Sequence, residues 1–146
     1  MIDFQNSVTY VLMQLAVAYR NTLERALSEI GLHSGQIFVL ISLWKSDGQS
    51  QTDLVKHLSL SAPTINKMVG SLLTGGFVEC RKCESDGRLV RVFLTEKGVE
   101  SHDLAAEQWN KVEDQSYLTL TETEKLVLAQ LFKKMKENLS QNVSST

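Results

Sequence analysis

The chain of 146 residues is long enough for one elaborated domain, and its composition, 42% hydrophobic and 22% charged, is that of an ordinary folded protein. No stretch approaches the ~18 consecutive apolar residues of a membrane span, and the first residues lack the basic and apolar regions of a signal peptide. Cys80 and Cys83 are too few for a disulfide framework. These features predict a cytoplasmic protein without a membrane partner.

The net charge of −2 is distributed unevenly along the chain. Residues 56–91 carry a net charge of +3, whereas residues 1–55 and 92–146 carry −2 and −3. A basic middle between acidic flanks suits a polyanionic partner such as nucleic acid. An ordinary solvated loop can also show an excess of three charges, so the predicted elements must decide between the two interpretations.

Helical periodicity covers the first third of the chain. Apolar residues recur every three or four positions over residues 8–30, which predicts one long helix ended by Gly31. A second helix is predicted to have Ser34 as its N-cap and to end at the turn pair Asp47-Gly48.

Two short helices are predicted next. Ser50 and Asp53 have the spacing of a capping box, which predicts that a helix begins there. Ser61 is placed to cap the following helix, whose first turn tolerates Pro63, and Gly75-Gly76 ends it. Two short helices joined by a tight turn indicate a helix-turn-helix.

The pattern then changes to that of strands. Residues 77–83 and 89–94 have strand composition, and the Asp86-Gly87 pair between them predicts a β-hairpin. Thr95 is the predicted cap of a further helix, and Thr121-Glu122-Thr123-Glu124 is a capping box that opens a last amphipathic helix. The predicted fold class is mainly α with a small β-hairpin, a winged helix-turn-helix with additional helices at both ends.

Several short segments lie in order between about Leu32 and Gly98: Leu54-Val55-Lys56-His57-Leu58-Ser59-Leu60-Ser61, Thr64-Ile65-Asn66-Lys67-Met68-Val69, Leu72, Gly76-Phe77-Val78-Glu79, Asp86-Gly87-Arg88 and Leu94-Thr95-Glu96-Lys97-Gly98. In this order and spacing the sequence resembles the MarR family of bacterial transcriptional regulators. The resemblance implies a homodimer that binds double-stranded DNA at a palindromic operator. The winged helix-turn-helix would then span residues 32–98, and dimerisation helices would span residues 1–31 and 99–146.

The face of the second short helix opposite its apolar stripe is the candidate DNA-binding surface. Asn66 can form two hydrogen bonds with adenine, and Lys67 can reach guanine or a phosphate. By resemblance, Arg88 at the hairpin tip contacts the minor groove or the DNA backbone, and Asp86 orients the wing. The predicted DNA-binding residues are Ser61, Ala62, Pro63, Thr64, Asn66, Lys67 and Arg88.

The two cysteines raise the question of a thiol or metal site. On a strand, Cys80 and Cys83 lie about 10 Å apart and point to opposite faces, whereas a disulfide needs Cα atoms within ~7 Å. Zinc would need two further ligands, and neither His57 nor His102 has a suitable spacing. We therefore predict no metal and no cofactor, and the absence of any catalytic motif predicts a protein that is not an enzyme. Cys80 and Gly87 stand where many family members have arginine, which removes positive charge from the wing.

The resemblance also implies a small, often aromatic effector in the cleft between the dimerisation helices and the winged helix. Its binding residues are not assigned, because each candidate is equally suited to the core: Tyr10, Met13, Phe38, Trp44 and Trp109. Two alternative functions stay open. One is a winged-helix module that binds a protein instead of an operator, and the other is a thiol- or metal-responsive regulator that uses Cys80 and Cys83.

Overall fold

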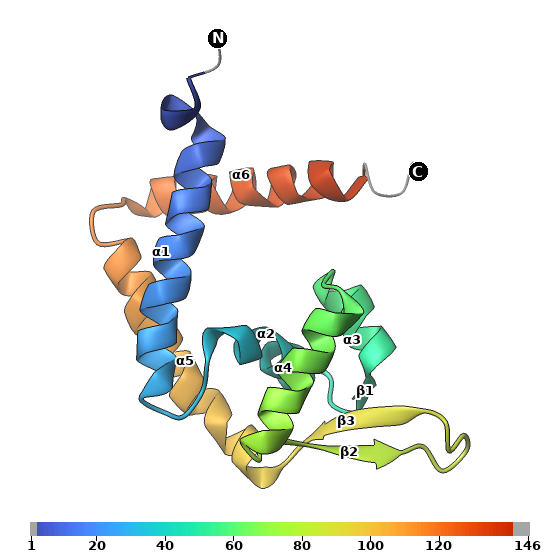
Figure 1. The fold of residues 1–146 in the computed structure, drawn as a ribbon. Helices are drawn as coiled ribbons and strands as arrows, with labels where there is room; N and C mark the ends of the chain where they lie inside the picture. Colours follow the sequence, from blue (N-terminus) through green and yellow to red (C-terminus); the bar gives the residue numbers. More distant parts are fainter. Residues whose placement is uncertain (1–2, 142–146) are drawn as a thin grey trace. The chain divides into compact units, whose positions relative to one another are not determined.

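The computed structural model describes residues 3–141, and the chain divides into two compact units, Met1–Val112 and Glu113–Thr146 (Figure 1). In chain order the elements are the 3-10 turn η1 (Phe4–Asn6), α1 (Val8–Ser28), α2 (Ser34–Lys45), β1 (Gln49–Ser50), α3 (Gln51–Leu58), α4 (Ala62–Thr74), β2 (Val78–Lys82), β3 (Val90–Leu94), α5 (Glu96–Ser116) and α6 (Glu122–Gln141). This order confirms the predicted winged helix-turn-helix with helical extensions. Within the described residues, none of these helices has the length and apolar character needed to cross a membrane.

Helix α1 is held at both ends by local hydrogen bonds. The Ser7 side chain accepts a hydrogen bond from the Tyr10 N–H (3.2 Å), which caps the start of the helix. Gly31 adopts a φ of 75°, and the Leu32 N–H donates to the Leu27 carbonyl (3.0 Å), which is the Schellman arrangement. Since Leu27 and Leu32 are fully buried, the turn predicted at Gly31 also closes one end of the core.

The prediction that Ser34 caps α2 is wrong by one residue. The N-cap is His33, whose N–H donates to the Gln36 side chain (2.9 Å), so that Ser34 is the first helical residue. The Ser34 N–H instead donates to the Glu24 carboxylate of α1 (2.7 Å). A residue ten positions earlier therefore satisfies the free N–H group at the start of α2, which local sequence cannot reveal.

We expect the Glu24→Gln variant to be less stable than the wild-type protein by about 1 kcal/mol near neutral pH, which is the usual contribution of a helix cap to the free energy of unfolding. Hydrogen bonds from His33 and then from Ser34 lower the pKa of Glu24 from 4.5 to about 2. Because the pKa is lower in the folded than in the unfolded chain, this stabilisation is complete above about pH 4.5 and is lost as the pH falls towards 2.

Urea unfolding from neutral to acidic pH checks this expectation. The difference in stability between the wild-type and Glu24→Gln proteins should shrink over that interval, while Glu100→Gln, at an exposed position of α5, should match the wild type throughout. Equal stability of the wild-type and Glu24→Gln proteins at every pH would show that this carboxylate does not support α2.

Helices α3 and α4 form the predicted helix-turn-helix. Ser50 and Asp53 make the predicted capping box, with the Asp53 N–H donating to the Ser50 hydroxyl (3.1 Å) and the Ser50 N–H donating to the Asp53 carboxylate (3.0 Å). Ser59 ends α3 in the left-handed conformation (φ 54°), and Ser61 caps α4. The apolar sides of the two helices enter the core of the first unit through Leu54, Ile65, Val69 and Leu72.

The wing is a three-stranded antiparallel sheet in the order β1-β3-β2, so the predicted hairpin is present with one further strand. In the hairpin, Val78 pairs with Leu94 and Lys82 with Val90. The additional strand β1 pairs Gln49 with Val92. It was not predicted because two residues between a turn and a helix cap leave no alternating pattern to detect.

The first turn of α5 is fastened to the chain segment that follows α4. The Lys97 ammonium donates to the Gly75 carbonyl (2.7 Å), the Thr95 hydroxyl donates to the Gly76 carbonyl (2.6 Å), and the Thr95 N–H donates to the Phe77 carbonyl (3.1 Å). Gly98 packs so tightly here that a Cβ atom on it would lie 2.0 Å from the Phe77 carbonyl oxygen. We call these contacts the α4–α5 junction.

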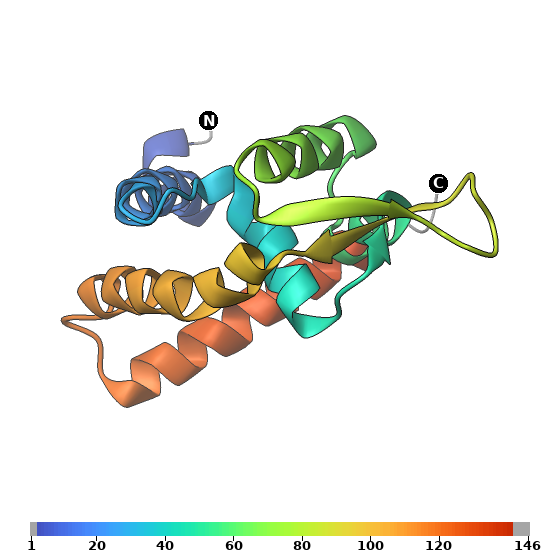
Figure 2. The ribbon, with the colours of Figure 1, turned by 90° about the horizontal axis from the view of Figure 1, so that it is seen from below.

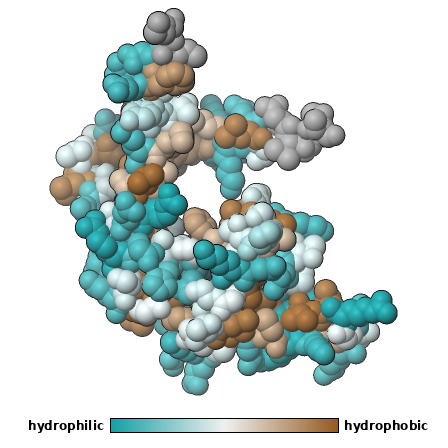
Figure 3. Space-filling view, in the orientation of Figure 1, coloured by the Kyte–Doolittle hydropathy of each residue, from teal (hydrophilic) through white to brown (hydrophobic). Residues whose placement is uncertain are grey.

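Helix α6, in the second unit, begins at the predicted capping box, in which the Glu124 N–H donates to the Thr121 hydroxyl (3.2 Å). Most of its large apolar side chains are exposed, namely Leu126, Val127, Leu131, Phe132, Met135 and Leu139. Helix α1 also exposes large apolar side chains, namely Val8, Tyr10, Val11, Met13, Leu15 and Val17. Figure 3 shows hydrophobic side chains on the visible surface of each helix. Two long helices with exposed apolar surface are unusual for a protein that works as a monomer.

Candidate nucleic-acid interface

The predicted DNA-binding residues of α4 lie on one exposed surface. The apolar stripe of the helix faces the core, and all six predicted residues on the other side are exposed: Ser61, Ala62, Pro63, Thr64, Asn66 and Lys67. The Ser61 and Thr64 hydroxyls lie 2.8 Å apart and hydrogen-bond to each other. The small residues of the first turn leave the start of α4 open to close approach by a ligand, and the helix dipole there favours a negative charge.

The tip of the wing is shaped by Asp86. Its carboxylate accepts a hydrogen bond from the Arg88 N–H (3.0 Å), and its carbonyl accepts one from the Leu89 N–H (3.0 Å). These two bonds fold the loop back on itself, as aspartate commonly does in turns. The Arg88 side chain is exposed, and within residues 3–141 its guanidinium has no hydrogen-bonding or acidic partner. A long cation is therefore presented at the end of an ordered loop.

The base of the wing is attached to the helix-turn-helix by Arg91. Its guanidinium donates to the Gly48 carbonyl (2.9 Å) and lies 4.0 Å from the Asp53 carboxylate at the start of α3. Arg81 faces Arg91 across the strands, which places two like charges opposite each other. Each charge has its own partner, because Arg81 is paired with Glu79. The sequence did not identify Arg91 as a positioning residue, since Gly48 is 43 positions away.

The helix surface and the wing tip lie on the same side of the first unit. In Figure 2 the loop between β2 and β3 extends beyond α3 and α4, on the side where α4 begins. Five exposed cations occur on α3, α4 and the hairpin, namely Lys56, Lys67, Arg81, Lys82 and Arg88. A convex helix flanked by a cationic hairpin is an arrangement that fits the major groove of DNA with the wing beside it.

The two cysteines are both unpaired. Cys80 lies in β2 and is exposed, whereas Cys83 lies in the turn after β2 with its sulfur 3.1 Å from the Ser85 hydroxyl. Hydrogen bonds from Ser85 lower the pKa of the Cys83 thiol. In the part of the chain that the structure describes, no group of three or more potential ligands among His, Cys, Asp and Glu is placed to hold a metal ion.

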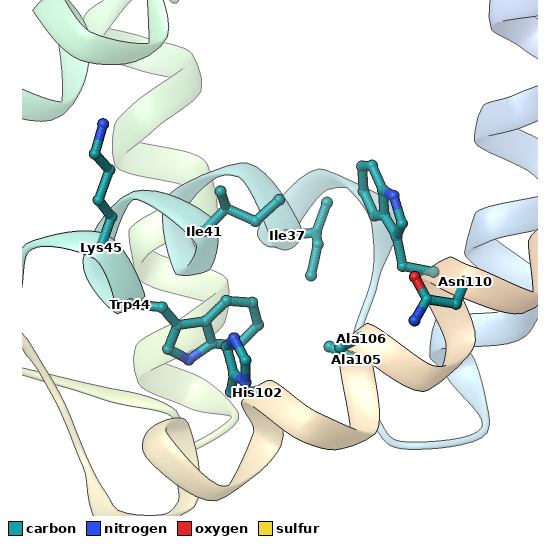
Figure 4. A pocket seen from close by; sticks show the side chains of 9 residues that line it. Ile37, Ile41, Trp44, Lys45, His102, Ala105, Ala106 and Asn110 are labelled. Carbon is teal, nitrogen blue, oxygen red and sulfur yellow. The ribbon is translucent and has the colours of Figure 1, made fainter. Parts of the chain in front are cut away.

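A pocket with a cavity volume of about 420 Å³ lies between α2 and α5 (Figure 4). Its lining is mostly apolar and aromatic, formed by Ile37, Ile41, Trp44, Lys45, His102, Ala105, Ala106, Trp109 and Asn110. The Trp44 and His102 rings meet edge to face, with centroids 5.0 Å apart. The size and lining suit a small aromatic molecule.

The pocket includes only some of the candidate effector residues. Trp44 and Trp109 line it, whereas Tyr10, Met13 and Phe38 do not and are instead exposed. The polar lining residues are Lys45, His102 and Asn110, which the sequence did not single out. The spacing of His102, Ala106 and Trp109 on one helix face would have been the only signal, and it resembles an ordinary core pattern.

The fold and its exposed cationic surface define a winged helix-turn-helix protein of the DNA-binding kind. Over residues 32–90 the chain matches the MarR family. It is 29% identical over 109 residues to the HTH-type transcriptional regulator BilQ of Clostridium symbiosum, an alignment that covers 75% of this chain and 76% of that one.

Solved structures show the same fold. A MarR protein from Peptoclostridium difficile superposes with a TM-score of 0.86 at 23% identity, covering 97% of this chain and 94% of that one. The reduced form of AbfR, solved bound to DNA, superposes with a TM-score of 0.74 at 25% identity, covering 92% of this chain and 93% of that one. The comparisons thus show a chain that is similar to the MarR family over residues 32–90 and that shares the fold of these solved structures over most of its length.

Proposed function

We propose that the protein is a transcriptional regulator that binds operator DNA as a homodimer. The observation that carries this proposal is the exposed first half of α4 beside an ordered wing that presents Arg88. The similarity to AbfR, which was solved bound to DNA, supports it. The protein then acts in the cytoplasm, where the chromosome is accessible, and it is not an enzyme.

In this proposal α4 reads bases and the wing holds the backbone. Asn66 and Lys67 face base edges in the major groove, and the start of α4 at Ser61 lies against a phosphate. Arg88 contacts the minor groove or a phosphate, and Asp86 holds the loop in the shape that presents it. The alternative of a protein-binding module has less support, because within residues 3–141 the exposed side chains at the start of α4 and at the wing tip are mostly polar or charged.

The homodimer is proposed from the exposed apolar residues of α1 and α6. Residues 1–31 and 99–146 supply the dimerisation helices, and residues 32–98 supply the DNA-binding part. A second copy would remove from water the apolar side chains that both helices expose, including Val11, Leu131 and Met135. Two-fold symmetry then places two α4 helices on one DNA face and requires a palindromic site.

The pocket between α2 and α5 is the proposed effector site. Its two indoles and two isoleucines suit a flat aromatic ring, and Lys45 offers a cation to an acidic group on that ring. Such a molecule would modulate DNA binding, because α2 supports both the pocket and α4: Gln36 of α2 donates a hydrogen bond to the Ser71 hydroxyl of α4 (2.7 Å).

Selection of binding sites from random duplex DNA tests the proposal. We expect a palindrome whose half-site centres lie about one helical turn, ~10 base pairs, apart. Sedimentation at micromolar concentration should give twice the chain mass of 16.4 kDa. Recovery of no sequence motif would favour the protein-binding alternative, and a stable monomer of 16.4 kDa would exclude the dimer.

A further inference from the structure

Trp44 belongs both to the pocket and to the α4–α5 junction. Its ring lines the cavity between α2 and α5, next to His102 (Figure 4). Its indole N–H donates to the Gly98 carbonyl in the first turn of α5 (2.9 Å), across 54 positions of sequence. A ligand that displaces this ring therefore also acts on the start of α5.

The start of α5 has no freedom to move independently of α4. Three successive carbonyls after α4, those of Gly75, Gly76 and Phe77, accept hydrogen bonds from Lys97 and Thr95. Gly98 lies directly against the Phe77 backbone, in a space that would not admit a single additional carbon atom. Closely packed contacts of this kind transmit a displacement instead of absorbing it.

We propose that Trp44 is a positioning residue that couples occupancy of the pocket to the recognition helix α4. An aromatic occupant competes with the indole for the space between α2 and α5 and turns its N–H away from the Gly98 carbonyl. The start of α5 then shifts relative to α2, and the end of α4 moves with it through the α4–α5 junction. This inference rests on the proposed function, since it assigns a route by which the pocket regulates operator binding.

A tethered occupant tests the coupling without an identified ligand. Ala106 lines the pocket from α5 and is half-buried, so that Ala106→Phe places an aromatic ring in the cavity (Figure 4). Trp44→Phe keeps an aromatic ring at position 44 and removes the indole N–H that donates a hydrogen bond to the Gly98 carbonyl. The two single variants and the double variant form a double-mutant cycle with the wild type.

The cycle has two readouts. We expect Ala106→Phe to lower affinity for the selected operator by on the order of tenfold in the wild-type background and by less than about twofold in the Trp44→Phe background. Hydrogen exchange at the Gly76 and Phe77 amides, which donate to the Leu73 and Leu72 carbonyls at the end of α4, should accelerate in the same pattern. A residue that only supported the fold would leave the effect of Ala106→Phe unchanged.

Trp109→Phe is the matched control, because Trp109 lines the same pocket without bonding to the α4–α5 junction. Ala106→Phe should retain its effect in that background. Equal effects of Ala106→Phe with and without the Trp44 N–H would overturn the proposal, as would no effect of Ala106→Phe on either readout. If Ala106→Phe lacks a cooperative unfolding transition, Ala106→Leu takes its place. If the protein binds no DNA, the proposed function fails, and amide exchange still decides whether the coupling exists.

Discussion

Replacing Gly98 with alanine is expected to destabilise the protein by about 3 kcal/mol, at the upper end of the usual cost of overpacking. The new Cβ would lie 2.0 Å from the Phe77 carbonyl oxygen and 3.2 Å from a Leu94 methyl group. A backbone oxygen cannot rotate away as a side chain can, so α5 would have to withdraw from the end of α4. Urea unfolding should therefore show a much lower midpoint for Gly98→Ala.

Gly35→Ala is the matched control for this substitution. Gly35 is exposed in the first turn of α2, and a Cβ atom there meets no other atom within 4 Å. Alanine is favoured over glycine in a helix, so this variant should be as stable as the wild type or more stable by up to about 1 kcal/mol. If Gly98→Ala unfolds at the same urea midpoint as the wild type, the α4–α5 junction is not closely packed around Gly98.

Asn66→Ala is expected to weaken binding to the selected operator by tenfold or more. Two hydrogen bonds to one base edge favour the correct base over a wrong one by ~1–3 kcal/mol. The variant loses these hydrogen bonds in both subunits of a dimer. Sequence preference should relax at the base pair that Asn66 contacts, while the salt dependence of binding stays unchanged, because no charge is removed. Titration of labelled duplexes at several salt concentrations measures both quantities.

Arg88→Ala is expected to differ from Asn66→Ala in the same titrations. It removes an unpaired cation from each wing, so affinity should fall and the salt dependence should become shallower by about one unit per lost phosphate contact. Arg25→Ala removes an equal charge from α1 and should change neither quantity, which makes it the charge-matched control. An unchanged salt slope and affinity for folded Arg88→Ala would mean that the wing does not contact DNA.

The sequence predicted the elements whose signals are local. The capping box at Ser50 and the turn at Asp86 each depend on residues two or three positions apart, and both are present in the structure. The start of α2 was misplaced because its cap depends on Glu24 in another helix. Strand β1 was not predicted because Gln49 pairs with Val92, and a strand of two residues carries no sequence pattern that indicates so distant a partner.

The candidate site shows the same division between local and distant determinants. The exposure of Asn66 and Lys67 follows from helical periodicity, because Ile65 and Val69 occupy the buried side of α4. The attachment of the wing through Arg91 and the link from Trp44 to α5 join residues 43 and 54 positions apart. Side-chain types and spacing along one element cannot specify such contacts, because they depend on how the elements pack.

The pocket also gives the protein an intrinsic optical reporter. Trp44 and Trp109 are the chain's two tryptophans, and both line the cavity between α2 and α5. Indole fluorescence excited selectively therefore originates from this one location, without background from tryptophan elsewhere in the chain. Quenching or a spectral shift on addition of a small molecule would report contact with the pocket directly. A library of aromatic acids could be screened on the unlabelled protein before its operator is identified.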